Sequence, residues 1–127
     1  MFEFFKSRAL SFRYAIGGWW YVIRTQRNAW IHAIISVCVI GISFWLGLNR
    51  YDWAMIVIAI AMVWTAEFIN TALEAIVDLA SPEQHDLAKI SKDVGASAVL
   101  IAAASSDIIV IIILVHPLWE RLMQVFN

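Results

Sequence analysis

Three long apolar runs constrain this chain more than any other feature. The first covers residues 31–48, the second begins at Trp53 and stays uncharged until Glu67, and the third covers 94–115 with one charge, Asp107. At a rise of about 1.5 Å per residue, a helical run of this length nearly crosses a hydrocarbon core of about 30 Å. With 62% hydrophobic residues in 127, the chain also holds more apolar surface than a water-soluble domain of this size can bury. The sequence predicts an all-α membrane protein.

The ends of the three membrane helices are expected at polar or helix-breaking residues. Residues 67–79 contain no Gly or Pro, so the second helix should continue past the apolar run to the Ser81-Pro82 pair. The tetrad 49–52 is interpreted as a tight turn, and the third helix is expected to end before His116-Pro117. The prediction is a single membrane-embedded domain, 1–127, with membrane helices at 31–48, 53–79 and 94–115.

The first 29 residues mix basic residues with Phe and Trp, which is typical of an amphipathic helix at an anionic membrane surface. A cleaved signal peptide is disfavoured, because no uncharged core precedes Arg13. Seven of the nine Lys and Arg residues lie in this segment or in the loop 81–92. By the positive-inside rule, we expect the N-terminus and this loop to be cytoplasmic.

Several function classes are disfavoured by composition and motifs. A net charge of -1 argues against a nucleic-acid partner, and the single cysteine, Cys38, excludes a disulfide framework within one chain. The sequence has no Walker lysine loop, no Gly-rich dinucleotide fingerprint, no nucleophile elbow and no protein-kinase motif set. Any use of ATP must therefore rely on another architecture.

Polar residues of the second predicted helix recur at helical spacing. They lie at offsets 0, 3, 4, 7 and 11 from the first, within a stripe about 100° wide. Glu67 and Glu74 are about 10 Å apart along the axis, so one can hold a metal near phosphates while the other meets a substrate hydroxyl. The alternative is a structural pairing of Glu67 with a neighbour. The stripe consists of Glu67, Asn70, Thr71, Glu74 and Asp78.

The loop 81–85 and the residues that follow it supply a second group of candidates. Lys92 is suited to bind a phosphate, and Asp93 to accept a hydrogen bond from an adenine amino group or to orient Lys92. The alternative for Lys92 is a positive-inside anchor before the third span. His85 has no partner at zinc-ligand spacing, which favours a loop hydrogen bond over a metal site.

With these residues in view, the chain resembles the prokaryotic diacylglycerol kinase and undecaprenol kinase family. The family signature is close to Glu-x-x-Asn-Ser/Thr-Ala-x-Glu-x-x-x-Asp, and residues 67–78 fit it. The likeness covers nearly the whole chain. It includes Phe12-Arg13-Tyr14-Ala15, Arg27-Asn28, Ile31-His32, Ser81-Pro82-Glu83 with His85, Lys92-Asp93 and Ala98-Val99-Leu100-Ile101.

The resemblance implies a homotrimeric lipid kinase in the inner (plasma) membrane of a prokaryote, with active sites shared between protomers. It implies that Glu67 takes the proton from the lipid hydroxyl, that Glu74 binds Mg²⁺ and that Asn70 positions the reacting groups. ATP is the implied co-substrate. Its implied contacts are Tyr14, Glu83, His85, Lys92 and Asp93.

Two positions depart from the family pattern. Gln26 stands where the family commonly has a second metal-binding glutamate, and an amide oxygen coordinates magnesium without contributing charge. Asp107 lies where related chains carry apolar or small residues, and we expect it to be protonated or paired with Asn or Ser.

The turn with Leu46-Gly47-Leu48 before Arg50 favours undecaprenol as substrate over diacylglycerol, because it most resembles the undecaprenol kinase branch. A non-catalytic reading remains open, in which the chain is a small channel or helix-bundle subunit and intramembrane acids line a polar path. The polar stripe disfavours it, because its acids gather at one end of a single helix.

Overall fold

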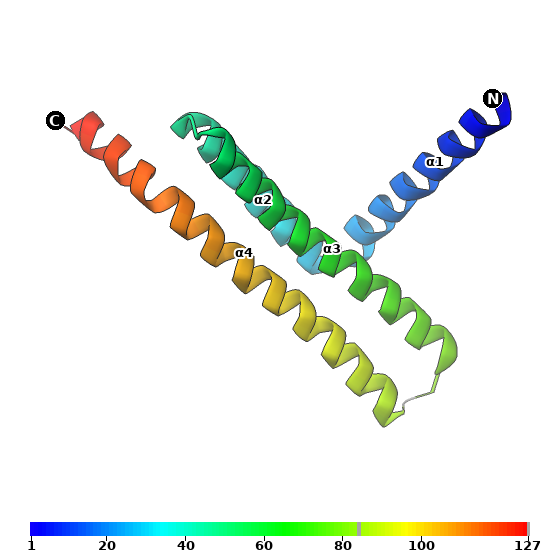
Figure 1. The fold of residues 1–127 in the computed structure, drawn as a ribbon. Coiled ribbons are helices and arrows are strands. Elements are labelled where there is room, and N and C mark those ends of the chain that lie inside the picture. The colour runs from blue at the N-terminus through cyan, green and yellow to red at the C-terminus, as the bar shows by residue number, and fades with distance from the viewer. Residues whose placement is uncertain (84, 127) are drawn as a thin grey trace.

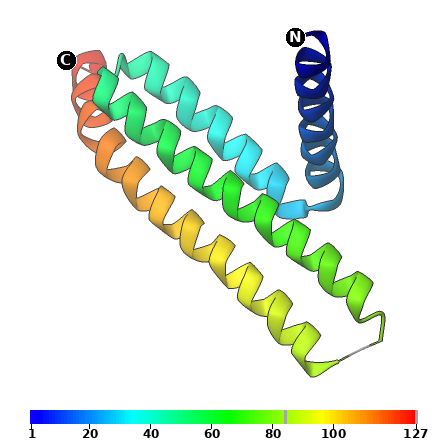
Figure 2. The ribbon, with the colours of Figure 1, turned by 45° about the vertical axis from the view of Figure 1, so that its right-hand side comes forward.

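The computed structural model describes residues 1–83 and 85–126, and every regular element in this part of the chain is an α-helix. There are four: α1 (Phe2–Thr25), α2 (Arg27–Leu46), α3 (Arg50–Ala80) and α4 (Asp86–Phe126). α2, α3 and α4 form an elongated bundle, whereas α1 leaves it at a steep angle (Figures 1 and 2). α2, α3 and α4 are each long and apolar enough to cross a membrane, which confirms the predicted number of spans.

The connection between α2 and α3 is a pair of helix caps. Gly47 ends α2 in the left-handed region, with φ of 66°, a conformation that glycine adopts without strain. The side-chain oxygen of Asn49 then accepts hydrogen bonds from the backbone N–H of Tyr51 (2.8 Å) and of Asp52 (3.1 Å). The prediction of a turn over 49–52 was wrong, because Arg50 already belongs to the first turn of α3.

The helices also extend beyond the apolar runs. α2 begins at Arg27 instead of residue 31, and the basic N-terminal segment, predicted as one helix over 1–29, stops at Thr25. Between them Gln26 is extended, with φ of -103° and ψ of 115°. α4 continues through Pro117 instead of ending before it, since one proline removes a single helical hydrogen bond and hydropathy marks the apolar part of a helix, not its ends.

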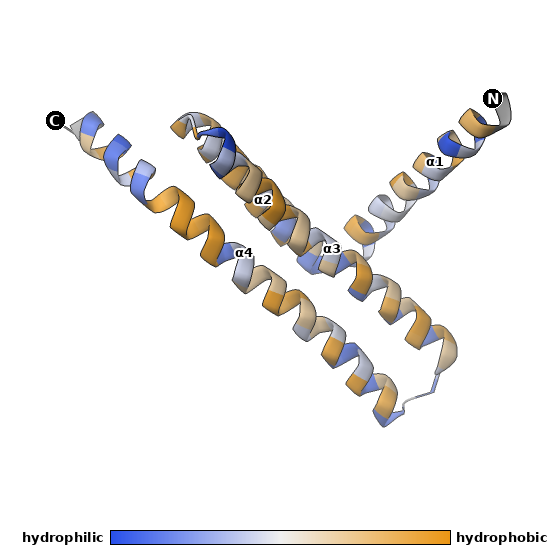
Figure 3. Ribbon diagram, in the orientation of Figure 1, coloured by the Kyte–Doolittle hydropathy of each residue, from blue (hydrophilic) through white to orange (hydrophobic). Residues whose placement is uncertain are grey.

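Apolar packing at two levels holds the helices together around α3. One cluster joins Val22 of α1, Ala29 of α2 and Trp64 of α3, and the other joins α2, α3 and α4 farther along the bundle. The middle of α4 is strongly hydrophobic and its C-terminal end hydrophilic (Figure 3). Large apolar side chains of α4 are nevertheless solvent-exposed in the single chain, with Ile112 72% exposed, as expected of a helix that contacts lipid or another protein surface.

The C-terminal end of α1 is held against α3 by aromatic side chains. The ring centroid of Trp19 lies 4.6 Å from that of Trp64 and 4.8 Å from that of Phe68. Contacts of this kind contribute about 0.5–1.5 kcal/mol beyond the area they bury. They fix the corner between α1 and α2 next to the polar face of α3.

Candidate active site

The polar stripe of α3 lies on one face, and this face turns from buried to exposed along the helix. The side chain of Glu67 is 2% exposed and Asn70 and Thr71 are buried, whereas the side chain of Asp78 is 64% exposed. The hydroxyl of Thr71 donates to the backbone carbonyl of Glu67 at 2.8 Å, which ties it to its own helix. The predicted common face is confirmed, and its first residues lie inside the bundle.

Glu74 is the centre of a small hydrogen-bond network. Its Oε2 accepts from Nε2 of Gln26 at 3.0 Å, and its Oε1 accepts from Nδ2 of Asn70 at 3.0 Å. Gln26 reaches Glu74 because it lies at the corner between α1 and α2, which packs against α3. Both oxygens of the Glu74 carboxylate are therefore held by neutral amide groups.

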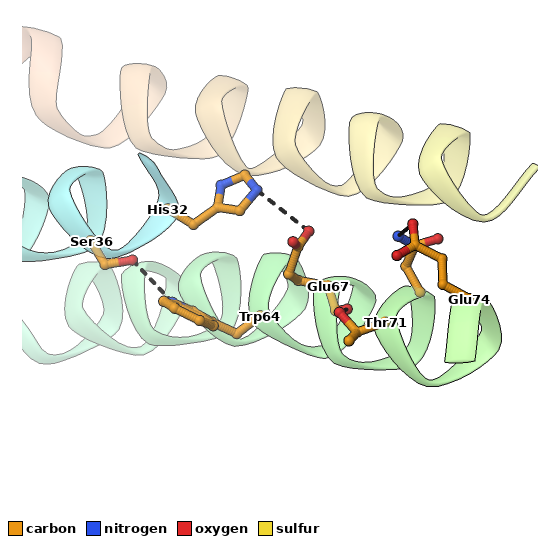
Figure 4. Close-up of polar contacts among 7 residues, drawn as sticks. His32, Ser36, Trp64, Glu67, Thr71 and Glu74 are labelled. Atoms are coloured by element: carbon orange, nitrogen blue, oxygen red, sulfur yellow. Dashed lines mark hydrogen bonds and ion pairs between the residues drawn. The ribbon is translucent and has the colours of Figure 1, made fainter. Parts of the chain in front are cut away.

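Glu67 faces α2 instead of its neighbours on α3. Its Oε2 lies 3.9 Å from Nε2 of His32, and the two side chains point toward one another (Figure 4). One turn farther along α2, Ser36 accepts a hydrogen bond from the indole N–H of Trp64 at 3.3 Å. These two contacts follow the antiparallel register of α2 and α3.

α4 approaches the network closely at Gly95. A Cβ at this position would overlap Oδ1 of Asn70 and contact Leu73, so only glycine fits here without a shift of the Asn70 side chain. Oδ1 of Asn70 is buried and has no hydrogen-bond partner among the described residues. Its lone pairs are available to a further donor or a cation.

Beyond the exposed end of the stripe, α3, α4 and their connection enclose a cavity of about 500 Å³. Glu83, His85 and Lys92 line it, and Nζ of Lys92 forms an ion pair of 2.5 Å with Asp78. Nδ1 of His85 accepts from the backbone N–H of Leu87, so the predicted loop hydrogen bond of His85 is confirmed. The cavity therefore carries both acidic and basic groups.

Residues 13–114 of the chain match the family model described as prokaryotic diacylglycerol kinase. The chain belongs to the prokaryotic diacylglycerol kinase family. A Synechocystis protein named diacylglycerol kinase is 42% identical over 110 residues, which cover 86% of this chain and 63% of that protein. A Bacillus subtilis protein named undecaprenol kinase is 37% identical over 99 residues, 78% of this chain and 77% of its own length. These names make the family one of lipid kinases.

An Escherichia coli protein named diacylglycerol kinase is similar over a shorter stretch, with 31% identity over 83 residues that cover 60% of this chain and 68% of that protein. The chain spans less than two thirds of the length of the Synechocystis relative. Membership in the diacylglycerol kinase family agrees with the resemblance inferred from the sequence.

The donors around Glu74 fit the magnesium ion that a kinase of this family implies. Mg²⁺ is commonly bound by one or two carboxylates together with phosphate oxygens of the substrate. Glu74 supplies one carboxylate, and the amides of Gln26 and Asn70, whose nitrogens face Glu74 here, would have to turn their oxygens toward a bound ion. Among the described residues no three His, Cys, Asp or Glu side chains gather into a metal site, so phosphate oxygens would have to complete the shell.

For the other predicted kinase residues the structure separates two groups. Glu83, His85 and Lys92 share the cavity near α4. Tyr14 is exposed on α1 and lines a separate hollow, and Asp93 is exposed next to the cavity residue Lys92. A nucleotide contact of Tyr14 or Asp93 stays a prediction.

Two residues around the site had no role assigned from the sequence. His32 and Gly95 belong to α2 and α4, and each faces the stripe of α3 across a helix interface. The position of His32 within an apolar run was a signal, since an ionisable side chain in a span usually faces a polar interior. Nothing in the spacing around Gly95 indicated a close helix contact.

Proposed function

We propose that this chain transfers the γ-phosphoryl group of ATP to the hydroxyl of a membrane lipid alcohol. Undecaprenol is the favoured substrate and diacylglycerol is the second candidate. The observation that carries the proposal is the placement of Glu67, buried on the same helical face as the Glu74 network and toward the apolar part of α3. In the proposal a lipid hydroxyl approaches this face from the bilayer along the groove that Asn70 borders, while phosphates approach Glu74 from the polar end. The positive-inside rule puts that end in the cytoplasm.

In the proposed reaction the lipid oxygen attacks the γ-phosphorus and the bond to the ADP oxygen breaks. Glu67 accepts the proton of the lipid hydroxyl, and Asn70 holds the Glu74 carboxylate in place by its hydrogen bond. A magnesium ion held by Glu74, with Gln26 beside it, would neutralise charge on the phosphates. Glu67 is assigned to the lipid and Glu74 to the phosphates because the stripe changes from buried at Glu67 to exposed at Asp78.

The nucleotide is proposed to occupy the cavity between α3 and α4. Lys92, one of two lysines that line it, is proposed to bind a phosphate, and Glu83 and His85 offer hydrogen-bonding groups to the sugar or base. Because Lys92 is paired with Asp78, a bound phosphate would replace the Asp78 carboxylate as the ionic partner of Lys92. Tyr14 and Asp93 complete the proposed contact set, with α1 brought close by a neighbouring protomer of a homotrimer.

The lipid tail is proposed to lie in an apolar groove of about 730 Å³ along α3 and α4. Ile69 and Ala98 line the groove, and Asn70 borders it as its link to the polar network. Tails of both proposed substrates are apolar, so the groove accepts either class. The names of the relatives likewise include both substrates.

The test is ATP-dependent phosphorylation of undecaprenol and diacylglycerol, side by side in detergent micelles. We expect wild-type protein with Mg²⁺ to form a phospholipid product and Glu67→Gln to lose at least about 10²-fold in rate, because the amide cannot accept the proton. Glu120→Gln, an exposed change on α4, is the matched control. An inactive wild type would instead favour the non-catalytic alternative, a small channel or helix-bundle subunit.

A further inference from the structure

His32 and Glu67 form a buried polar pair at the interface of α2 and α3. Nε2 of His32 lies 3.9 Å from Oε2 of Glu67, and the side chains are 14% and 2% exposed. Neither atom has a hydrogen-bond partner among the described residues. Buried polar atoms are rarely left without a partner, so two such atoms facing each other require an explanation.

The surroundings leave Glu67 as the ionic partner of His32. On the side of α4, His32 lines a cavity of about 300 Å³ together with Ala96, Val99 and Ala103, none of which is ionisable. Among the described residues, Glu67 is the one acidic side chain within 4 Å of the His32 ring nitrogens.

We propose that His32 is a positioning residue for Glu67, an inference that rests on the proposed function. With its proton on Nε2, the imidazole donates to Oε2 of Glu67 and so leaves Oε1 for the lipid hydroxyl. The distance of 3.9 Å is longer than a hydrogen bond. Hydrogen bonds in catalytic sites are often long without substrate and shorten in the reacting complex, and closure of this one orients the carboxylate.

The kinetic test compares His32→Ala, His32→Gln and His116→Ala in the lipid phosphorylation assay. We expect His32→Ala to lower kcat on the order of 10²-fold, the usual effect of a misplaced reacting group, and to leave the KM for ATP unchanged. Glutamine keeps a donor and should recover much of the loss. His116, exposed on α4 and paired with Glu120, is the matched control and should be neutral.

A double substitution separates positioning from packing. In the Glu67→Asp background the shorter side chain withdraws the carboxylate from His32. If His32 acts by positioning Glu67, adding His32→Ala should then lower kcat little further. If His32→Ala only disturbs packing, it should lower kcat by the same factor as in the wild-type background. An unchanged kcat in His32→Ala, or an equal loss in both backgrounds, would overturn the proposal.

A measurement that requires no enzymatic turnover tests this inference independently of the proposed function. We expect the ¹⁵N signal of the His32 ring to differ between wild type and Glu67→Gln in micelles, while those of His85 and His116 stay in place. An unmoved His32 signal would overturn the contact itself. A wild type that fails to phosphorylate lipid, yet shows the His32 shift, would refute the kinase proposal and leave the pair intact.

Discussion

Gln26 is the single residue between α1 and α2, and its amide donates to Glu74 at 3.0 Å. A glutamine here gives the site one carboxylate where a glutamate would give two. Without a cation, two carboxylates at this distance would repel each other, whereas an amide stabilises Glu74. The present residue therefore favours the metal-free state.

Replacing Gln26 by Glu is expected to lower the magnesium concentration for half-maximal activity about tenfold, which corresponds to about 1.4 kcal/mol. The measurement is a Mg²⁺ titration of lipid phosphorylation. Gln124→Glu adds the same charge at an exposed position of α4 and should leave the requirement unchanged. An unchanged or higher requirement in Gln26→Glu would show that this position does not face the metal.

Gly95 tests the hydrogen bond between Asn70 and Glu74. Gly95→Ala introduces a methyl group that overlaps Oδ1 of Asn70, so we expect kcat to fall about tenfold as the amide is displaced. Gly41→Ala is the control, because a Cβ there meets no atom within 4 Å. Equal activity of the two variants would argue that the position of Asn70 is unimportant.

At the scale of the helices, caps decide where α2 ends and α3 begins. Gly47 and Asn49 separate α2 from α3 within a few residues. The sequence located all three membrane helices because the hydrophobicity of a segment indicates whether lipid or water surrounds it. It misplaced their ends because α4 continues through Pro117 and because the tetrad after Leu48 begins a helix.

Loss of the Asn49 cap is expected to destabilise the hairpin of α2 and α3. Asn49→Ala removes the acceptor of two backbone N–H groups, a change that typically costs about 1 kcal/mol. Thermal unfolding in detergent, followed by circular dichroism, measures it. Asn28→Ala removes the same amide from an exposed position near the start of α2 and should be neutral, and a similar loss in both would refute a capping role.

For the molecule as a whole, the helical period of the sequence predicted which α3 residues share a face. It did not predict the partners of that face. The contacts of Glu67 with His32 and of Asn70 with Gly95 depend on how α2 and α4 are aligned against α3, and periodicity within one helix holds no such information. The same limit leaves Tyr14 apart from the cavity lined by Glu83, His85 and Lys92 in the single chain.

The orientation in the membrane is testable with single cysteines. In a Cys38→Ser background, we expect Arg50→Cys to react with a membrane-impermeant maleimide in intact cells and Lys89→Cys to react after permeabilisation, because basic residues favour the cytoplasmic side. Both positions are exposed in the chain. The opposite pattern of labelling would invert the topology and place the proposed ATP site outside the cell.

The joint of one residue between α1 and α2 has a mechanical consequence. α1 and α2 are both regular helices, so a change in the angle between them falls on the one extended residue, Gln26. Because the Gln26 amide donates to Glu74, such a change would be felt first by that hydrogen bond.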